Sequence, residues 1–182
     1  NLVFVGNIIP RKGVYFLIKA FHKFCQDNDF KEKLLIVGDN QNKEYLNECL
    51  KLIKEKSIKN VEFLGNKSPE ELSLIYSSSK LLVMASSYEG LPRVLIESGL
   101  CGTPSLASNI QGINDPFGKN GGTILYNLND MEDFQIKLKN FIVDKKLQIE
   151  LQEKSNSLSV NLSGKDSFLN NWIEIENIIY GK

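Results

Sequence analysis

Two segments of the sequence place charged side chains directly ahead of helices that we expect from the apolar pattern. In the first, Arg11 and Lys12 precede a helix whose apolar residues recur at helical spacing from Val14 onward. The N-terminus of a helix already carries about half a positive charge, so cations beside it are unfavourable unless an anion lies there. We therefore interpret Arg11 and Lys12 as candidate ligands for an anion. The alternative is that both are solvated loop cations.

The second segment leads into a helix that we expect to start at Pro92. Proline suits the first helical position, so the backbone N–H groups of Leu91, Arg93 and Val94 are expected to lack a partner within the helix. Arg93 is again a cation at the unfavourable end of a helix. Free amides and a cation at one helix N-terminus favour the binding of a phosphate group.

Two carboxylates belong to the same segment. Glu89 lies in the loop ahead of the helix, and Glu97 interrupts an apolar run just over one turn inside it. Glu89 either complements the helix dipole or accepts hydrogen bonds from hydroxyl groups, and Glu97 is either an exposed helix residue or a similar acceptor. Taken together, the cations, free amides and carboxylates suit a ligand that joins a diphosphate to hydroxyl-rich rings.

Strand-like and helix-like segments alternate along the chain, which predicts an α/β fold with a parallel sheet and helices on both of its faces. In such a sheet ligands lie beyond the carboxyl ends of the strands, and both charged segments follow an expected strand. We expect a single Rossmann-like three-layer domain over residues 1–182, with its core at about 1–128 and C-terminal helices at about 129–182. The Ser-Pro-Glu-Glu sequence at 68–71 predicts a capping box and a proline at the first helical position. Strands are expected at 2–5, 34–37, 61–64, 81–84, 104–107 and 123–126, and helices at 14–25, 45–53, 69–76, 92–101, 131–155 and 167–179.

The composition argues against several classes of function. The 182 residues carry 22 Lys+Arg and 22 Asp+Glu, and this zero net charge argues against a nucleic-acid partner or an anionic membrane held by bulk electrostatics. No apolar run is long enough to cross a bilayer. Cys25, Cys49 and Cys101 lie far apart in apolar contexts, which favours free buried thiols in a reducing compartment. The chain opens at Asn1 in a strand-like run, and we interpret it as a piece of a longer polypeptide.

At this point the residues indicate a family. The most specific motif is Glu89-Gly-Leu-Pro-x-Val-Leu-x-Glu97, which follows an apolar strand and runs into Cys101-Gly-Thr-Pro. With this motif, the chain resembles over essentially its whole length the C-terminal, nucleotide-sugar-binding domain of retaining glycosyltransferases with the GT-B architecture, in the group 1 family (GT4). The resemblance also rests on Val5-Gly6 through Pro10, Lys12 and Gly13, on Leu-Ile-Val-Gly-Asp at 35–39, and on Phe-Leu-Gly at 63–65.

The resemblance implies a role for each residue that matches. Lys12 contacts the diphosphate of a nucleotide-diphosphate sugar, Glu89 contacts hydroxyls of the transferred sugar, and Glu97 binds the nucleotide ribose. Lys12, with Arg11 or Arg93, stabilises the leaving diphosphate as its charge builds, so Lys12 and Glu89 are the catalytic candidates. The other expected substrate-binding residues are Gly65 and Asn66 near the base and Gly90, Leu91 and Val94 near the distal phosphate.

The sequence departs from the family pattern in two places. The family commonly has Arg directly after the first-turn glycine, and this chain has Asn7, so Arg11 is the candidate substitute for that phosphate contact. The Gly-Gly…Glu often found after the fifth strand is replaced at 111–115, which leaves the role of that loop open. The resemblance implies no metal, and we assign the Asp-x-Asp pattern at 27–29 to a turn that ends a helix. His22 is interpreted as a surface or boundary residue.

These expectations together describe the donor half of a two-domain enzyme whose N-terminal acceptor domain lies outside the sequence. We expect retaining transfer of a sugar to a glycan or lipid-linked acceptor, without a cofactor or metal, in polysaccharide or glycoconjugate biosynthesis. The domain alone is expected to be inactive. The expected location is the cytoplasm, and peripheral association of the full-length enzyme with the inner face of the membrane is left open. The alternative is a module that binds nucleotide sugars without catalysing transfer.

Overall fold

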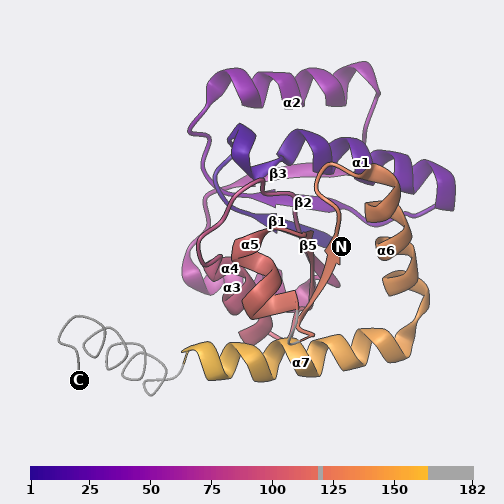
Figure 1. Cartoon of the computed structure of the whole chain (residues 1–182). Coiled ribbons are helices and arrows are strands. Elements are labelled where there is room, and N and C mark those ends of the chain that lie inside the picture. The colour runs from indigo at the N-terminus through magenta and orange to yellow at the C-terminus, as the bar shows by residue number, and fades with distance from the viewer. Residues whose placement is uncertain (119–120, 164–182) are drawn as a thin grey trace.

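The computed structural model describes residues 1–118 and 121–163, and a six-stranded sheet forms the centre of this part of the chain (Figure 1). The strand order is β3-β2-β1-β4-β5-β6, and every neighbouring pair is parallel, as predicted. The strands are β1 (Leu2–Val5), β2 (Leu34–Val37), β3 (Val61–Gly65), β4 (Leu81–Met84), β5 (Ser105–Ser108) and β6 (Thr123–Tyr126).

Helices cover both faces of the sheet, which confirms the three-layer prediction. All four residues of β1 and all four of β4 are buried, because each of these strands is covered from both sides. Helices α1, α2 and α6 pack on one face, and α3 and α4 pack on the other (Figure 1). The helices are α1 (Val14–Asn28), α2 (Lys43–Glu55), α3 (Pro69–Ser78), α4 (Arg93–Leu100), α6 (Met131–Val143) and α7 (Lys145–Ser163), with a 3₁₀ turn, η1 (Pro10–Lys12), ahead of α1.

The order in which the chain adds strands to the sheet reverses next to β1. From β1 the chain moves outward through β2 and β3, and it then returns to β4 on the other side of β1. Open α/β sheets bind ligands at such a switch point, beyond the carboxyl ends of the two central strands. The two charged segments of the sequence follow β1 and β4, so the fold brings them to the same place.

The start of α3 confirms the predicted capping box. Ser68 Oγ accepts the N–H of Glu71 at 3.2 Å, and the Glu71 carboxylate accepts the N–H of Ser68 at 2.8 Å. Pro69 occupies the first helical position. The cap satisfies backbone donors at the helix start and keeps the connection between β3 and α3 short.

Close packing between α4 and α7 follows from small residues. A Cβ atom on Gly99 would lie 2.0 Å from Ser159 Oγ and 2.7 Å from the carbonyl oxygen of Ser155. Asn156 Nδ2 donates a hydrogen bond of 3.0 Å to the Gly99 carbonyl. A side chain at position 99 would separate the helices, so Gly99 allows the close contact between α4 and α7.

The prediction of one helix over 131–155 is wrong, because the chain breaks at Asp144. Asp144 has an extended backbone, and its Oδ1 accepts the N–H of Leu147 at 2.9 Å, so it caps the start of a new helix. That helix, α7, continues to Ser163, beyond the predicted end at residue 155. The helix predicted at 167–179 lies outside the described residues.

Two smaller predictions are also corrected. Pro92 precedes α4 as its N-cap and is not its first helical residue, because its backbone is extended and its carbonyl accepts the N–H of Leu95 at 3.0 Å. The loop after β5 contains helical turns that the sequence did not predict, α5 (Gln111–Ile113) and the π-helical η2 (Asn114–Gly118). These turns form because Ile113 and Phe117 are buried in the second core layer.

Candidate functional site

The side chains of Lys12 and Glu89 meet beyond the ends of β1 and β4. Lys12 Nζ lies 2.5 Å from Glu89 Oε1, and Arg11 Nη1 lies 3.5 Å from Glu89 Oε2. The Arg11 guanidinium also donates a hydrogen bond of 2.6 Å to the carbonyl of Tyr88. The fold therefore gathers three of the predicted site residues into one cluster.

Backbone contacts hold the two loops of this cluster together. Gly13 adopts a left-handed conformation with φ of 67°, and a Cβ atom there would lie 2.3 Å from the carbonyl oxygen of Ala85. The N–H of Ser87 donates a hydrogen bond of 2.9 Å to the carbonyl of Arg11. Only glycine allows both this backbone conformation and this approach. The relative position of Lys12 and Glu89 is therefore fixed by the backbone as well as by their ion pair.

The cluster keeps one positive charge, because it combines two cations with one carboxylate. The Glu89 side chain is 8% exposed and that of Lys12 is 15% exposed, so their attraction is weakly screened by water. The Arg11 side chain is 43% exposed and its ion pair is longer, so it holds Glu89 less strongly. The sequence offers no anion near the two cations, and the fold supplies Glu89 from the loop after β4.

The start of α4 lies next to the cluster. Leu95 donates the first hydrogen bond of the helix, to Pro92, so the amides of Arg93 and Val94 precede the helical ladder as predicted. Gly90, Leu91 and Arg93 are exposed, and Val94 is half-buried. The amides in this stretch can therefore receive an anion that approaches the cluster from solvent.

Glu97 does not join the cluster with Glu89. It lines a separate cavity of about 380 Å³ between α3 and α4, together with Arg93 and Tyr76. The Tyr76 hydroxyl donates a hydrogen bond of 3.2 Å to Glu97 Oε2. Burial, followed by the negative charge of Glu97, raises the pKa of Tyr76, so this hydroxyl stays a proton donor. Glu97 is thus a positioned acceptor and not an exposed helix residue.

Gly65 and Asn66 line a second cavity, of about 320 Å³, at the ends of β2 and β3. Its wall includes the side chain of Phe63 and the chain at Ile8, so it borders the first turn as well. The N–H of Gly38 donates a hydrogen bond of 2.9 Å to the carbonyl of Gly65, and this bond fixes the wall. Apolar side chains, including those of Leu46 and Leu50, form much of the wall, so the cavity can hold a flat ring.

Comparison with known proteins gives the family of the chain. The model of the family described as "Glycosyl transferases group 1" matches residues 1–157. The chain belongs to the group 1 glycosyltransferases. An uncharacterized glycosyltransferase of Methanocaldococcus jannaschii is 29% identical over 163 residues, which cover 88% of this chain and 43% of that protein. The chain thus spans less than half of the length of that relative.

Solved structures show the same fold. The C-terminal domain of the group 1 glycosyltransferase LpcC from Francisella tularensis superposes with a TM-score of 0.76 at 17% identity, covering 89% of this chain and 85% of that domain. The Anabaena protein HepE, solved in complex with UDP and glucose, gives a TM-score of 0.76 at 20% identity, covering 88% of this chain and 43% of that protein. The chain therefore has the fold of one half of a GT-B glycosyltransferase.

In this group 1 glycosyltransferase chain, Gly112 supports the site in a way that the sequence did not reveal. A Cβ atom on Gly112 would lie 2.0 Å from the carbonyl oxygen of Glu89 and 2.6 Å from that of Gly90. The loop at 111–115 thus packs directly against the backbone that carries Glu89. A glycine within a polar loop has many explanations, so only the fold could show this contact.

The remaining candidates lie away from the cluster. Asn7 Nδ2 donates a hydrogen bond of 3.0 Å to Gln41 Oε1. Asn7 therefore points toward Gln41, whereas Arg11 lies beside Glu89. Within the described residues, no group of three or more His, Cys, Asp or Glu is placed to hold a metal ion. The Asp-x-Asp pattern ends α1 as predicted, because Asp27 pairs with Lys23 at 2.8 Å and the residue after α1 is left-handed. His22 is half-buried on α1, in agreement with its interpretation as a boundary residue.

The cysteines do not contribute a nucleophile. Cys25, Cys49 and Cys101 are free, as predicted, and Cys49 is fully buried, whereas Cys25 and Cys101 are half-buried and not buried as expected. Burial raises the pKa of Cys25 to about 11 and that of Cys49 to about 12. Both thiols are therefore protonated at neutral pH and unreactive. Among the described residues, no helix is both long and apolar enough to span a membrane.

Proposed function

We propose that this chain is the donor-binding half of a glycosyltransferase that moves a sugar from a nucleotide-diphosphate sugar to an acceptor. The observation that carries the proposal is the cluster of Arg11, Lys12 and Glu89 at the switch point of the sheet, with one positive charge in excess. It is supported by the family of the chain and by HepE, a protein of the same fold that was solved with UDP and with UDP-glucose.

The diphosphate of the donor binds at Lys12 and Arg11, with the amides at the start of α4 around the distal phosphate. These groups stabilise the negative charge that builds on the diphosphate as the sugar leaves. A preorganised donor of this kind lowers the barrier by about 2.7–4 kcal/mol. Lys12 is the stronger contributor, because its side chain is the less exposed of the two cations.

Glu89 changes partners when the donor binds. Before binding, its carboxylate accepts the Lys12 ammonium at 2.5 Å. A phosphate that approaches Lys12 competes with the carboxylate for the same hydrogen-bond donors. Glu89 then turns its oxygens to hydroxyls of the transferred sugar. The ion pair with Lys12 thus compensates the charge of the nearly buried Glu89 carboxylate until the nucleotide-diphosphate sugar binds.

The nucleoside part occupies the cavities at Gly65 and at Glu97. The base lies in the cavity at Gly65 and Asn66, and the ribose hydroxyls donate to Glu97, whose carboxylate is held by Tyr76. Arg93 lines the Glu97 cavity, so it contacts the ribose side of the diphosphate and does not contact Glu89. The titration described below identifies the base and the sugar.

The wider reaction belongs to the same proposal. The acceptor is a glycan or a lipid-linked sugar bound by an N-terminal domain, transfer retains the anomeric configuration, and no metal or cofactor takes part. Residues 1–182 form one domain that is inactive alone, and the full-length enzyme works in the cytoplasm or at the inner face of the membrane in polysaccharide or glycoconjugate biosynthesis. The alternative is a module that binds nucleotide sugars without catalysing their transfer.

The test is a titration of the chain with UDP, GDP, ADP and their glucose conjugates by calorimetry. We expect one of the three bases to bind, with the diphosphate binding much more tightly than the corresponding nucleoside. Binding of none of them contradicts the donor site. Transfer by the full-length protein, measured with the nucleotide sugar that binds, separates an enzyme from a binding module.

A further inference from the structure

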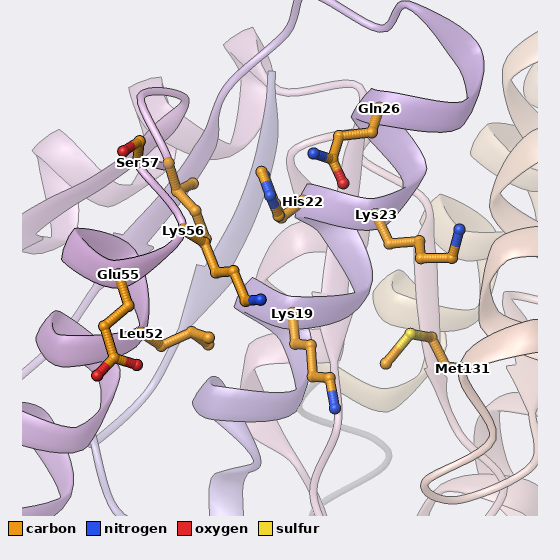
Figure 2. A pocket seen from close by; sticks show the side chains of 10 residues that line it. Lys19, His22, Lys23, Gln26, Leu52, Glu55, Lys56, Ser57 and Met131 are labelled. Carbon is orange, nitrogen blue, oxygen red and sulfur yellow. The ribbon is translucent and has the colours of Figure 1, made fainter.

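A cavity of about 440 Å³ lies beside α1, outside the donor site described above (Figure 2). It is lined by residues of α1, of the end of α2 with the turn that follows it, and of the start of α6, and we call it the α1–α2 cavity. None of the predicted site residues lines it. His22, near its centre, is separated from Val14 at the start of α1 by eight residues, which is about 12 Å along the helix axis.

Basic side chains from two helices converge on the α1–α2 cavity. Lys19 and His22 lie three positions apart on α1, so they share one face of the helix. Lys56 follows the last residue of α2, and its side chain reaches across the cavity so that its amine lies beside α1 (Figure 2). The Lys56 side chain is thus directed toward Lys19 and His22. It does not turn back to the free carbonyl groups at the C-terminus of α2, which would attract a cation.

The neighbouring carboxylates do not neutralise these groups. Asp27 pairs with Lys23 at 2.8 Å. Glu55 lines the cavity, but its carboxylate points away from His22 and from the Lys56 amine (Figure 2), and it lies 3.8 Å from Lys51, which is outside the cavity lining. In the part of the chain that the structure describes, the ammonium groups of the other two cavity lysines form no ion pair or side-chain hydrogen bond. Two lysines and an imidazole therefore line one cavity, and no carboxylate of the described residues is paired with either ammonium group.

Apolar side chains form part of the α1–α2 cavity wall, beside the polar side chains of Lys23, Gln26, Glu55 and Ser57. Leu52 and Ile58 are buried, and Met131 is half-buried at the edge opposite α2 (Figure 2). The volume lies in the range of cavities that bind small molecules. A ligand that suits this wall carries a compact anion at one end and an apolar body at the other.

We propose that the α1–α2 cavity binds a phosphate monoester. The phosphate lies between Lys19, Lys56 and His22, and the organic part rests against Leu52 and Met131. A phosphate monoester at neutral pH carries between one and two negative charges, which matches two unpaired ammonium groups better than a carboxylate does. This site is independent of the proposed donor site and needs neither the acceptor domain nor a nucleotide.

The test uses phenyl phosphate as the probe, with phenol and inorganic phosphate beside it, and follows backbone amide signals of the 182-residue chain by NMR. We expect phenyl phosphate to shift the signals of His22 and Lys56 in a saturable way, and to bind more tightly than either of the other two. Saturable shifts only at Gly13 and Glu89 would place the phosphate in the donor site and overturn the proposal.

A matched pair of variants distinguishes binding in the α1–α2 cavity from non-specific attraction of the phosphate to surface lysines. Lys56→Gln removes a cavity lysine, whereas Lys59→Gln removes an exposed lysine three residues later that does not line the cavity. We expect Lys56→Gln to lower the affinity for phenyl phosphate about fivefold, which is the size of effect expected for a solvent-accessible ion pair. Lys59→Gln should leave this affinity unchanged. Equal weakening in both variants would reduce the effect to net charge and overturn the proposal. Lys19→Gln is the second cavity variant and is expected to behave like Lys56→Gln.

The same phosphate chemistry occurs in soluble esters and in phosphatidic acid. Sedimentation with vesicles of phosphatidylcholine, with and without phosphatidic acid, identifies the source. Binding to phosphatidic acid vesicles that Lys56→Gln weakens supports a lipid phosphate, and absence of vesicle binding with retained phenyl phosphate binding supports a soluble ester. If the unmodified chain binds neither phenyl phosphate nor vesicles that contain phosphatidic acid, the proposal is wrong.

Discussion

Lys12 and Glu89 lie 77 positions apart in the sequence, yet their side chains form an ion pair of 2.5 Å beyond the ends of β1 and β4. The pair is largely shielded from water, so each group depends on the other until a ligand enters. Changing either residue therefore has two effects, one on the ligand and one on the partner that remains. This coupling gives the two substitutions different expected effects on nucleotide binding.

Replacing Lys12 by alanine is expected to weaken UDP binding about tenfold or more, because a hydrogen bond to a charged group contributes about 1.5–3 kcal/mol. Uridine lacks the diphosphate, so its affinity should stay the same. Calorimetric titration of both ligands measures the difference. Lys43→Ala serves as the control, because it removes an exposed lysine at the start of α2. An equal loss of affinity for UDP and for uridine would contradict a contact between Lys12 and the diphosphate.

Replacing Glu89 by glutamine is expected to leave UDP binding unchanged or stronger, because Lys12 and Arg11 no longer share their charge with a carboxylate. Sugar transfer by the full-length protein should fall about 100-fold, since hydrogen bonds to sugar hydroxyls strengthen in the transition state. Glu132→Gln, an exposed change on α6, is the control. If Glu89→Ala leaves the transfer rate unchanged, the proposed role of this residue is wrong.

The sequence predicts the strands well, because apolar runs such as Leu81–Met84 are buried on both faces and leave little choice of structure. It also predicts which loops carry the cluster, since parallel strands end at one edge of the sheet. It does not predict that Glu89 neutralises Lys12, because that pairing depends on strand order. Nor does it reveal the helix break at Asp144, where one side-chain hydrogen bond competes with an otherwise continuous helical pattern.

Replacing Gly112 by alanine is expected to destabilise the chain by about 1–3 kcal/mol, because the added methyl group overlaps the backbone of Glu89 and Gly90. The contact atoms are backbone carbonyls, so the loop that carries Glu89 has to move. Sugar transfer by the full-length protein should fall with it. Urea unfolding measures the stability, and Gly90→Ala is the stability control, because a Cβ there meets nothing within 4 Å. Equal stability of both variants would contradict the contact.

Replacing Cys49 by alanine is expected to make stability less sensitive to alkaline pH. Burial raises the pKa of this thiol from 9.0 to about 12, so the native chain keeps a proton that the unfolded chain releases above pH 9. The unfolded state then binds fewer protons, and the free energy of unfolding falls as pH rises, by about 1.4 kcal/mol per pH unit for this one group. Below pH 9 the thiol is protonated in both states and contributes no slope.

Urea unfolding of the unmodified chain and of Cys49→Ala between pH 8 and pH 10.5 measures this difference. Ile18→Val is the control, because it also removes buried volume but adds or removes no titrating group. Both substitutions should lower stability at pH 8, and only Cys49→Ala should flatten the decline above pH 9. Parallel curves for all three proteins would show that the thiol titrates alike in the folded and unfolded chain, which would contradict its burial on the inner face of α2.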